Sequence, residues 1–255
     1  MYQLNQIKVI REEKTILDIK NLTIDPHGFT VILGHNGSGK STLVNVLAKQ
    51  CSLQQGMVLL NDKPLEKYSA RALAKAVAYL PQKLPEVAGL SVRELVRLGR
   101  YPWRGVFGQW NSDDHQIIEM AMSQTQVNTM SHALADQLSG GEKQRAWIAM
   151  LLAQQSDFLI LDEPTSALDV QHQYQVMNLL KTLNQKSGKG VLVILHDLNL
   201  ALRYASHVIA LKQGRVLFEG EQALLLNEKQ LSTLYNTRIT LIDHPHHPSK
   251  VAIIC

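Results

Sequence analysis

Four short apolar runs recur along the chain, each ended by glycine or by polar residues. They are "TVILG" (30–34), "AVAYLPQ" (76–82), "DFLILDEP" (157–164) and "GVLVILHD" (190–197). Continuous runs of this length predict strands that are buried on both faces, and helical patterns lie between them. The sequence therefore predicts an α/β fold with a mostly parallel sheet. A fifth segment, "HVIALKQGRVLFEG" (207–220), differs, because two short strands around "KQG" predict an antiparallel hairpin.

The strand signal disappears between Gln82 and Leu138. Two segments there, "SVRELVRLGR" and "SDDHQIIEMAMSQTQV", have helical spacing, and "YPWRGVFGQW" is typical of an aromatic, glycine-containing connection. We therefore expect a helical subdomain at 83–138, inserted into an α/β core formed by residues 1–82 and 139–255.

Composition narrows the class of protein. With 255 residues, 45% of them hydrophobic, the chain can bury one or two domain cores. Its 26 basic and 22 acidic residues give a net charge of +4 without a Lys/Arg run, which makes nucleic acid a weak expectation. Cys51 and Cys255 form no disulfide framework, which favours a reducing cytoplasm.

Targeting signals are also not expected. The N-terminal segment "MYQLNQIKVIREEK" has no apolar core of signal-peptide length. The longest apolar segments fall short of the roughly 18 residues that cross a bilayer. If a membrane is involved, we expect another chain to cross it.

The first candidate site is "GHNGSGKS" (34–41), which satisfies G-x-x-x-x-G-K-[ST] with a predicted strand before it and a helix after it. A glycine-rich turn with a surface lysine is the simpler interpretation, but this context favours a phosphate-binding loop. Its glycines let the backbone wrap a phosphate, Lys40 reaches the β and γ oxygens, and Ser41 ligates Mg²⁺. The predicted nucleotide-binding residues here are Gly34, His35, Asn36, Gly37, Ser38, Gly39, Lys40, Ser41 and Thr42.

Four further side chains follow predicted strands. Asp162 suits Mg²⁺, directly or through water, and Glu163 is placed to polarise an attacking water. Gln82 suits both Mg²⁺ and that water, and His196 suits a γ-phosphate; a single histidine is otherwise more often structural. Ligands of open parallel sheets bind at the carboxyl ends of strands, so we expect these residues to converge there.

"LSGGEKQR" (138–145) is a second candidate anion site, since two glycines open a helical run and leave backbone N–H groups exposed. Together with the phosphate-binding loop, Gln82, "LILDE" (159–163), "SALD" (166–169) and His196, it resembles the complete motif set of ATP-binding-cassette ATPases. This resemblance implies a P-loop NTPase fold: a RecA-like parallel core with an antiparallel β portion and the inserted helical subdomain.

The resemblance also implies an assembly. Two such domains pack head to tail as a homodimer, and Ser139, Gly140 and Gly141 bind the γ-phosphate held by the other subunit's Lys40, with ATP and Mg²⁺ as cofactors. Asp169 is then expected at the seam. Members of the family commonly stack adenine on an aromatic residue before the phosphate-binding loop, whereas this sequence has Arg11 in that region. Arg11 either stacks through its guanidinium plane or is a solvated charge; the sequence leaves both open.

Two stretches, residues 79–105 and 139–154, resemble ATPases of bacterial importers for iron–siderophore complexes, haem and vitamin B12, and among these the ferric hydroxamate type. This implies a peripheral protein on the cytoplasmic face of the inner membrane, whose helical subdomain docks an integral membrane permease fed by a periplasmic or surface substrate-binding protein. Haem or vitamin B12 cargo is the alternative. A soluble cassette ATPase acting on nucleic acid or ribosomes would favour basic stripes or coiled-coil insertions, and a P-loop kinase or GTPase would lack "LSGGE".

Two charged segments have more than one interpretation. Arg93, Arg97, Arg100 and Arg104 recur at helical spacing, which predicts either a solvated basic face or a docking surface for a membrane subunit or acidic headgroups. "DHPHHPSK" (243–250) is expected to be a solvated tail rather than a metal site.

Overall fold

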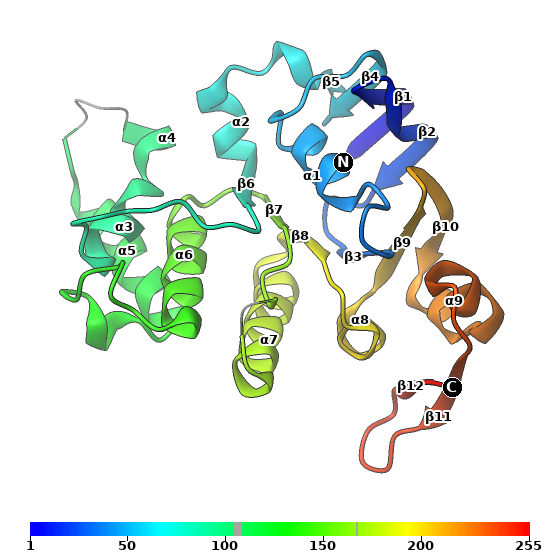
Figure 1. Cartoon of the computed structure of the whole chain (residues 1–255). Helices are drawn as coiled ribbons and strands as arrows, with labels where there is room; N and C mark the ends of the chain where they lie inside the picture. Colours follow the sequence, from blue (N-terminus) through cyan, green and yellow to red (C-terminus); the bar gives the residue numbers. More distant parts are fainter. Residues whose placement is uncertain (105–108, 167) are drawn as a thin grey trace. The chain divides into compact units, whose positions relative to one another are not determined.

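The computed structural model describes residues 1–104, 109–166 and 168–255 (Figure 1). Residues 105–108 in the predicted aromatic connection and Ala167 in "SALD" lie outside the described residues. The described residues form two compact units, Met1–Lys67 with Gly190–Cys255, and Tyr68–Lys189. The expected subdomain boundaries, 83–138, stay a prediction.

The first unit is built on strands from both ends of the chain. Its elements are β1 (Tyr2–Arg11), β2 (Lys14–Ile24), β3 (Phe29–Leu33), α1 (Lys40–Leu47), β4 (Gln55–Leu60), β5 (Lys63–Pro64), η1 (Leu65–Lys67), β8 (Gly190–Ile194), α8 (Leu198–Tyr204), β9 (His207–Lys212), β10 (Arg215–Glu221), η3 (Gln222–Leu226), α9 (Glu228–Tyr235), β11 (Ile239–Asp243) and β12 (Lys250–Ile254).

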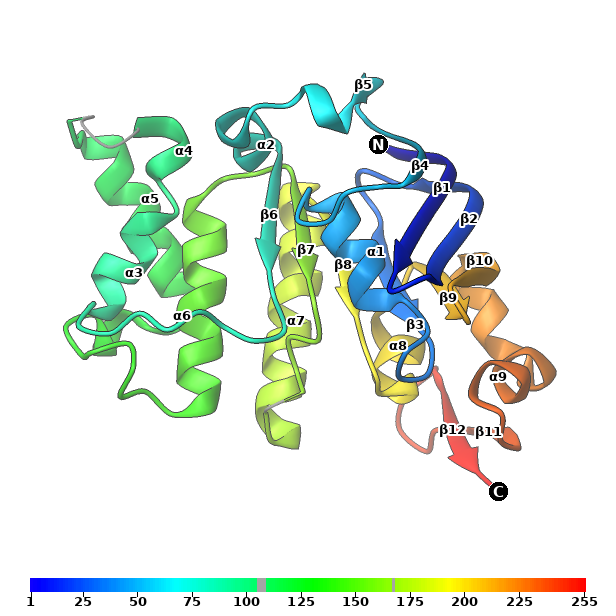
Figure 2. The same ribbon diagram turned by 45° about the horizontal axis from the view of Figure 1, so that its top comes forward.

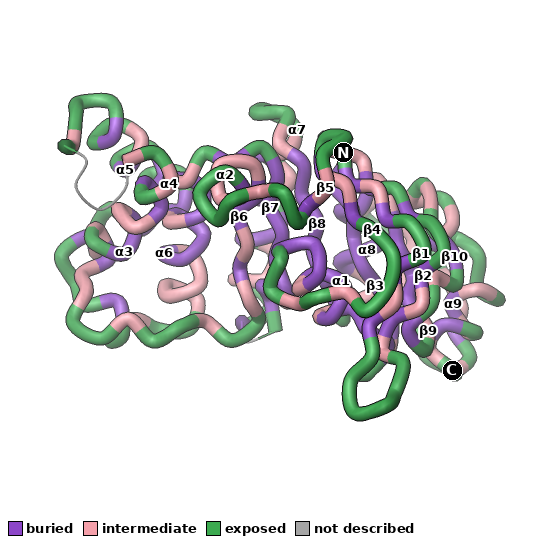
Figure 3. The backbone as a smooth tube through the Cα atoms, turned by 90° about the horizontal axis from the view of Figure 1, so that it is seen from above, coloured by how far each residue is buried: buried purple, intermediate pink, exposed green. Residues whose placement is uncertain are grey.

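The parallel strands of this unit form the predicted core. β3 pairs in parallel with β8 on one side and with β9 on the other, and β10 adds antiparallel to β9. Every residue of β3 and β8 is buried, as expected for a sheet covered on both faces (Figure 3). The predicted strands at 30–34 and 190–197 and the hairpin at 207–220 are confirmed. The turn at Gln213 and Gly214 has positive φ at both positions, which suits a two-residue hairpin.

A second, antiparallel sheet in this unit accounts for the N-terminal segment. Its strand order is β2-β1-β4-β5, and β1 pairs with β2 along almost its whole length. The sequence analysis assigned no strands here, although buried Leu4, Ile7 and Val9 alternate with polar residues over part of β1. Charged and amide side chains on the outer face, with the chain reversing at Glu12 and Glu13, obscured the pattern.

The second unit combines a strand pair with helices. Its elements are α2 (Ala70–Ala76), β6 (Val77–Leu80), α3 (Val92–Leu98), α4 (Tyr101–Arg104), α5 (Ser112–Gln124), η2 (Asn128–Met130), α6 (Gly140–Ala153), β7 (Phe158–Leu161) and α7 (Val170–Ser187). β6 and β7 run parallel side by side (Figure 2), which confirms two more predicted strands and, with the first unit, the α/β fold class. α3 and α5 lie in the two segments with predicted helical spacing, and both pack against α6, which follows residue 138 (Figure 1).

Three helices of this unit begin with reciprocal side-chain caps. Ser91 and Glu94 open α3, Asn111 and Asp114 open α5, and Ser139 and Glu142 open α6 in the same way. Each pair satisfies two backbone N–H groups that the helix itself leaves without a partner. One expectation is corrected here: "YPWR" forms the short helix α4 instead of belonging to a connection.

The prediction that Arg100 shares a helical face with Arg93 and Arg97 is wrong. α3 ends at Leu98, so Arg100 lies beyond the helix, and it is only 5% exposed. Its Nε donates to Asp114 Oδ1 at 3.0 Å, and Arg104 forms a second ion pair with the same carboxylate. Burial alone would raise the pKa of Asp114, but hydrogen bonds from Arg104 and Arg100 hold that pKa below its usual range. Both arginines therefore neutralise the buried carboxylate of Asp114, Arg100 from within the unit and Arg104 from a partly exposed position.

The C-terminal histidines also differ from the prediction. β11 and β12 pair as an antiparallel hairpin, so His244, His246 and His247 lie in its loop and not in a solvated tail. His247 Nδ1 lies 2.8 Å from Ser249 Oγ, and the backbone N–H of His246 donates to His244 Nδ1. Over residues 1–104, 109–166 and 168–255, no group of three or more His, Cys, Asp or Glu side chains could hold a metal ion.

No helix among the described residues is long and apolar enough to cross a membrane.

Removing the charge of Asp114 tests the buried ion pairs. Asp114→Asn leaves Arg100 buried without its counter-charge, and we expect a loss of about 3–5 kcal/mol of unfolding free energy. All three tryptophans of the chain, Trp103, Trp110 and Trp147, lie in this unit, so urea unfolding followed by tryptophan fluorescence measures its stability.

The matched control is Asp113→Asn, at the neighbouring exposed position of α5, which should change stability by less than about 0.5 kcal/mol. Equal unfolding midpoints for the two variants would contradict a structural role for the pair.

Candidate nucleotide site

The phosphate-binding loop joins β3 to α1, as predicted. Lys40 opens α1 with 5% exposure, and its Nζ donates to the carbonyl oxygens of Gly34 at 2.8 Å and His35 at 3.1 Å. The N-cap residue of α1, Gly39, has φ 101° and offers no side-chain cap to the helix. The first N–H groups of α1 therefore face the loop beside a buried ammonium, which is the arrangement that binds a phosphate.

Two further observations describe how this loop is packed. A Cβ added at Gly34, where φ is 151°, would lie 2.3 Å from Leu211 O and 2.5 Å from Ser38 Oγ, so only glycine fits. Ser38 Oγ is buried, and it finds no hydrogen-bond partner within the part of the chain that the structure describes. A buried hydroxyl in that condition is expected where an external ligand supplies the missing bond.

His196 follows the strand next to β3. Because Val31 and Ile32 of β3 pair in parallel with Val193 and Ile194 of β8, Gly34 and His196 leave the same edge of the sheet. Asp197 then caps α8 by accepting hydrogen bonds from Asn199 N at 2.7 Å and Leu200 N at 3.2 Å. His196 is exposed and lines a cavity of about 450 Å³ that also contacts Tyr235, whose pKa burial raises.

The second unit brings three predicted residues together. Leu80 of β6 pairs with Leu161 of β7, and Asp162 N donates to Leu80 O at 2.9 Å. One residue further on, Glu163 Oε2 accepts a hydrogen bond from Gln82 Nε2 at 2.5 Å. Asp162 is 4% exposed and lies near Tyr79. Burial of the Tyr79 phenol and, to a smaller extent, the charge of Asp162 raise the pKa of that phenol to about 12. Gln82, Asp162 and Glu163 thus converge at one edge, as the sequence predicts.

Glu163 has an uncommon backbone conformation. Its φ is 51°, a left-handed value that costs energy for a residue with a side chain. Ser166 holds the turn, since its backbone N–H and its Oγ both donate to Glu163 O, at 3.2 and 3.0 Å. Strain of this kind is commonly retained where the surrounding structure must aim a functional group.

The predicted second anion site lies at the start of α6. Ser139 is the N-cap residue, and Gly140 and Gly141 are the first two helical residues. Ser139 Oγ donates to Glu142 Oε2 at 2.6 Å, and Ser139 N donates to the same oxygen at 3.0 Å. These bonds lower the pKa of Glu142. The sequence analysis missed the role of Glu142, although S-x-x-E was visible in "SGGE" as a capping box.

Asp169 and Arg11, the remaining predicted site residues, are both exposed. Asp169 is exposed and is the N-cap of α7, where it accepts from His172 N at 2.9 Å. Arg11 lies at the exposed end of β1, and its Nη2 is 3.7 Å from Cys51 Sγ. Whether Arg11 stacks on adenine stays a prediction, as do the individual roles of the other site residues.

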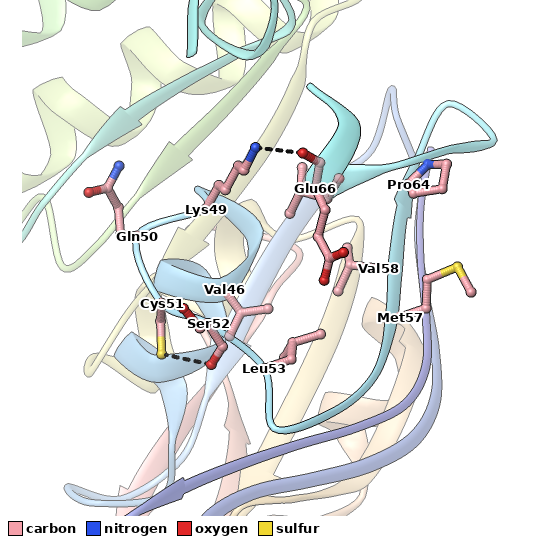
Figure 4. A pocket seen from close by; sticks show the side chains of 11 residues that line it. Val46, Lys49, Gln50, Cys51, Ser52, Leu53, Met57, Val58, Pro64 and Glu66 are labelled. Carbon is pink, nitrogen blue, oxygen red and sulfur yellow. Dashed lines mark hydrogen bonds between the residues drawn. The ribbon is translucent and has the colours of Figure 1, made fainter. Parts of the chain in front are cut away.

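A cavity of about 400 Å³ adjoins Cys51 (Figure 4). It lies between the end of α1, the following loop, β4 and η1, with Val46, Leu53 and Val58 among its apolar lining. The phosphate-binding loop lies at the opposite end of α1, about 12 Å away along eight residues of helix. The cavity is therefore separate from the phosphate site.

Known sequences identify the class of protein. The family described as "ABC transporter" matches residues 17–166, more than half of the chain. The chain belongs to this family of ATP-binding-cassette proteins and is an ATPase of that class.

Three curated relatives are similar over most of their length. The probable siderophore transport ATP-binding protein YusV of Bacillus subtilis is 44% identical over 82% of this chain and 76% of its own. The ferric enterobactin transport protein FepC of Escherichia coli is 39% identical, over 89% and 84%. The iron(3+)-hydroxamate import protein FhuC of Bacillus subtilis is 36% identical, over 94% and 90%.

Solved structures share the fold. A putative metal-chelate type ABC transporter in an inward-facing conformation matches with a TM-score of 0.85 over 100% of this chain and 96% of its own, at 23% identity. The dimeric cassette MJ0796, bound to ADP and Pi, matches with a TM-score of 0.77 at 28% identity, over 87% and 99%.

Filling the close contact at Gly34 tests the phosphate-binding loop. In Gly34→Ala the added methyl group collides with Leu211 O, so the loop must shift, and we expect a fluorescent ATP analogue to bind at least about tenfold more weakly. The control is Gly89→Ala, which also has positive φ but whose added Cβ meets no described atom within 4 Å. Unchanged binding in Gly34→Ala would contradict the assignment of this loop.

Proposed function

We propose that this chain is the ATPase subunit of an importer for iron(III)–siderophore complexes, in which two copies pair head to tail beneath a membrane permease. The observation that carries the ATPase mechanism is the hydrogen bond between Gln82 and Glu163 at the end of the parallel pair β6–β7. The observation that supports the cargo is the similarity to siderophore-import ATPases over most of the chain.

The residues that would hold the nucleotide follow from the loop geometry. Backbone N–H groups of residues 38–41 and the Lys40 ammonium would bind the phosphates, with Ser38 Oγ as a further donor. Ser41, Asp162 and Gln82 would ligate Mg²⁺, because hydroxyl, carboxylate and amide oxygens are the ligands that this ion prefers. When bound, MgATP supplies the phosphoanhydride bond that is hydrolysed.

Hydrolysis needs a base near the attacking water. Glu163 accepts the water's proton, and Gln82, already bonded to that carboxylate, orients it. His196 donates a hydrogen bond to the γ-phosphate and stabilises charge that develops there. The strained φ of Glu163 supports this role, because it fixes the direction in which the carboxylate leaves the strand.

In a head-to-tail pair, the second anion site at the start of α6 binds the ATP of the other copy. The start of α6, with Ser139, Gly140 and Gly141, binds the γ-phosphate held by the neighbouring copy's Lys40, and Asp169 lies at the seam. The dimeric form of MJ0796, 28% identical, supports such an assembly. ADP lacks the γ-phosphate, so hydrolysis loosens the pair and converts chemistry into movement.

The membrane partner and the cargo are inferred from the relatives. We assign residues 83–138 as the helical subdomain that docks the permease at the cytoplasmic face of the inner membrane, with a substrate-binding protein on the other side. A ferric hydroxamate is the proposed cargo, because residues 79–105 and 139–154 resemble ATPases of that type and FhuC is similar over 94% of this chain, at 36% identity.

An isosteric substitution tests the base. Glu163→Gln keeps the side-chain shape and the hydrogen-bonding partner Gln82 but removes the proton acceptor. We expect ATP binding within about twofold of the parent, ATP hydrolysis slower by about 10²- to 10⁴-fold, and an ATP-bound dimer on gel filtration. Glu66→Gln, at an exposed position outside the site, should leave all three unchanged. Normal turnover in Glu163→Gln would refute the assignment of Glu163.

A growth experiment tests the cargo. Cells that lack this chain should not grow when a ferric hydroxamate is the sole iron source, and they should grow normally on ferrous iron. The parent chain should restore growth and Lys40→Ala should not, because the latter loses the ammonium in the phosphate-binding loop. Growth on the hydroxamate with a defect on a ferric catecholate, haem or vitamin B12 would assign the motor to another cargo and leave its ATPase mechanism intact.

A further inference from the structure

One histidine of the second unit touches two predicted site segments at once. His172 lies in the first turn of α7, and its ring Nδ1 is 2.8 Å from Oδ1 and 2.9 Å from Oδ2 of Asp169. Its backbone N–H donates to the same carboxylate at 2.9 Å. A carboxylate accepts, so Nδ1 carries the proton, and Nε2 is the nitrogen on the far side of the ring.

The His172 ring also lies close to Gly141, the second residue of α6. A Cβ added there would lie 3.1 Å from both Cγ and Cδ2 of His172 and 3.4 Å from its Nε2. Gly141 has no positive φ and lies in the first turn of α6, where its backbone conformation suits any residue. The backbone therefore does not require this glycine. A Cβ at this position would be tight against the imidazole ring, which would have to shift by a few tenths of an ångström to admit it.

The residue after His172 secures the loop that precedes α7. Gln173 Nε2 donates to Leu168 O at 3.0 Å and to Thr165 O at 3.3 Å. Consecutive residues of one helical turn thus hold the Asp169 loop on one side and the start of α6 on the other. The bond network around Asp169 lowers the pKa of its carboxyl, first through His172 N and then through the His172 ring. The carboxylate is therefore charged, and a strong acceptor for the ring, at neutral pH.

We propose that His172 is a positioning residue that fixes Asp169 and the Ser139–Gly141 turn as one surface for the neighbouring copy's ATP. This inference rests on the proposed head-to-tail pairing. His172 acts through two contacts: the hydrogen bond sets the direction of the Asp169 carboxylate, and the ring sets the position of the first N–H groups of α6. Its loss should weaken the ATP-induced pairing of two copies and leave the nucleotide affinity of the phosphate-binding loop unchanged.

The test compares variants in a Glu163→Gln background, where pairing is measured without turnover. His172→Ala removes both contacts, His172→Asn keeps an N–H donor near the Asp169 carboxylate, and His172→Phe keeps a ring over Gly141 without a donor. Gln175→Ala, at an exposed position of α7, is the matched control. Sedimentation with and without ATP gives the dimerisation constant, and a fluorescent ATP analogue gives the affinity of the monomer.

We expect His172→Ala to lower the ATP-dependent dimerisation constant at least tenfold, His172→Asn and His172→Phe each to restore part of it, and Gln175→Ala to have no effect. Monomer affinity for the analogue should stay within twofold throughout. Tryptophan fluorescence checks that each variant is folded. Dimerisation of His172→Ala equal to that of its parent would overturn the inference. A parent that stays monomeric with ATP would overturn the head-to-tail pairing itself, and the role of His172 with it.

A double substitution isolates the ring contact. Gly141→Ala should impair pairing when His172 is present, because the added methyl group meets the ring. If that collision is the cause, combining it with His172→Ala should cost less than the sum of the two single effects. Strict additivity would show that Gly141 and His172 act separately, and it would overturn the proposed ring contact.

Discussion

The phosphate-binding loop carries the buried ammonium of Lys40 next to a run of backbone N–H groups. These donors keep their positions only if other elements fix the backbone of the loop. In this chain that support comes from the turn between β9 and β10. Gly214 N donates to Ser38 O at 3.0 Å, and Gly214 O accepts from Asp18 N at 2.8 Å. The turn therefore ties the phosphate-binding loop to β2 of the antiparallel sheet. Leu211 O lies directly against Gly34 on the same side, so the hairpin, the N-terminal sheet and the loop constrain one another.

The features that were predictable are those in which the chemical pattern is local. β3, β6, β7 and β8 are short apolar runs, and burial of nearly every residue makes them visible without a partner. The site residues Gln82, Asp162, Glu163 and His196 were recognisable because each follows such a run. Parallel strands bring their carboxyl ends to one edge, so the convergence of Gln82 and Glu163 follows from topology.

Features that depend on a distant partner were not predictable. Arg100 has the spacing of a helical basic face, but α3 ends before it, and its carboxylate partner lies 14 residues further along the chain. The histidines near the C-terminus looked like a tail because the pairing of β11 with β12 gives weak local signals on either side of them. His172 carries no signal at all until Gly141, from another helix, is found beneath its ring. In each case a tertiary contact overrides what the local pattern favours.

α6 shows how the interior of the second unit reaches the candidate site. At its C-terminal end, Arg100 Nη1 donates to Ala153 O at 2.8 Å and Trp103 Nε1 donates to Gln154 O at 2.7 Å. These donors satisfy carbonyls that the helix leaves without partners, and the guanidinium is a favourable charge at the negative end of the helix dipole. At the N-terminal end, the Ser139–Glu142 cap and the His172 ring define where the first turn lies. A helix held at both ends by side chains of other elements cannot slide along its axis without breaking several bonds. The position of its N-terminal N–H groups is therefore a property of the whole unit, and the buried ion pairs of Asp114 contribute to the geometry of a surface that they do not touch.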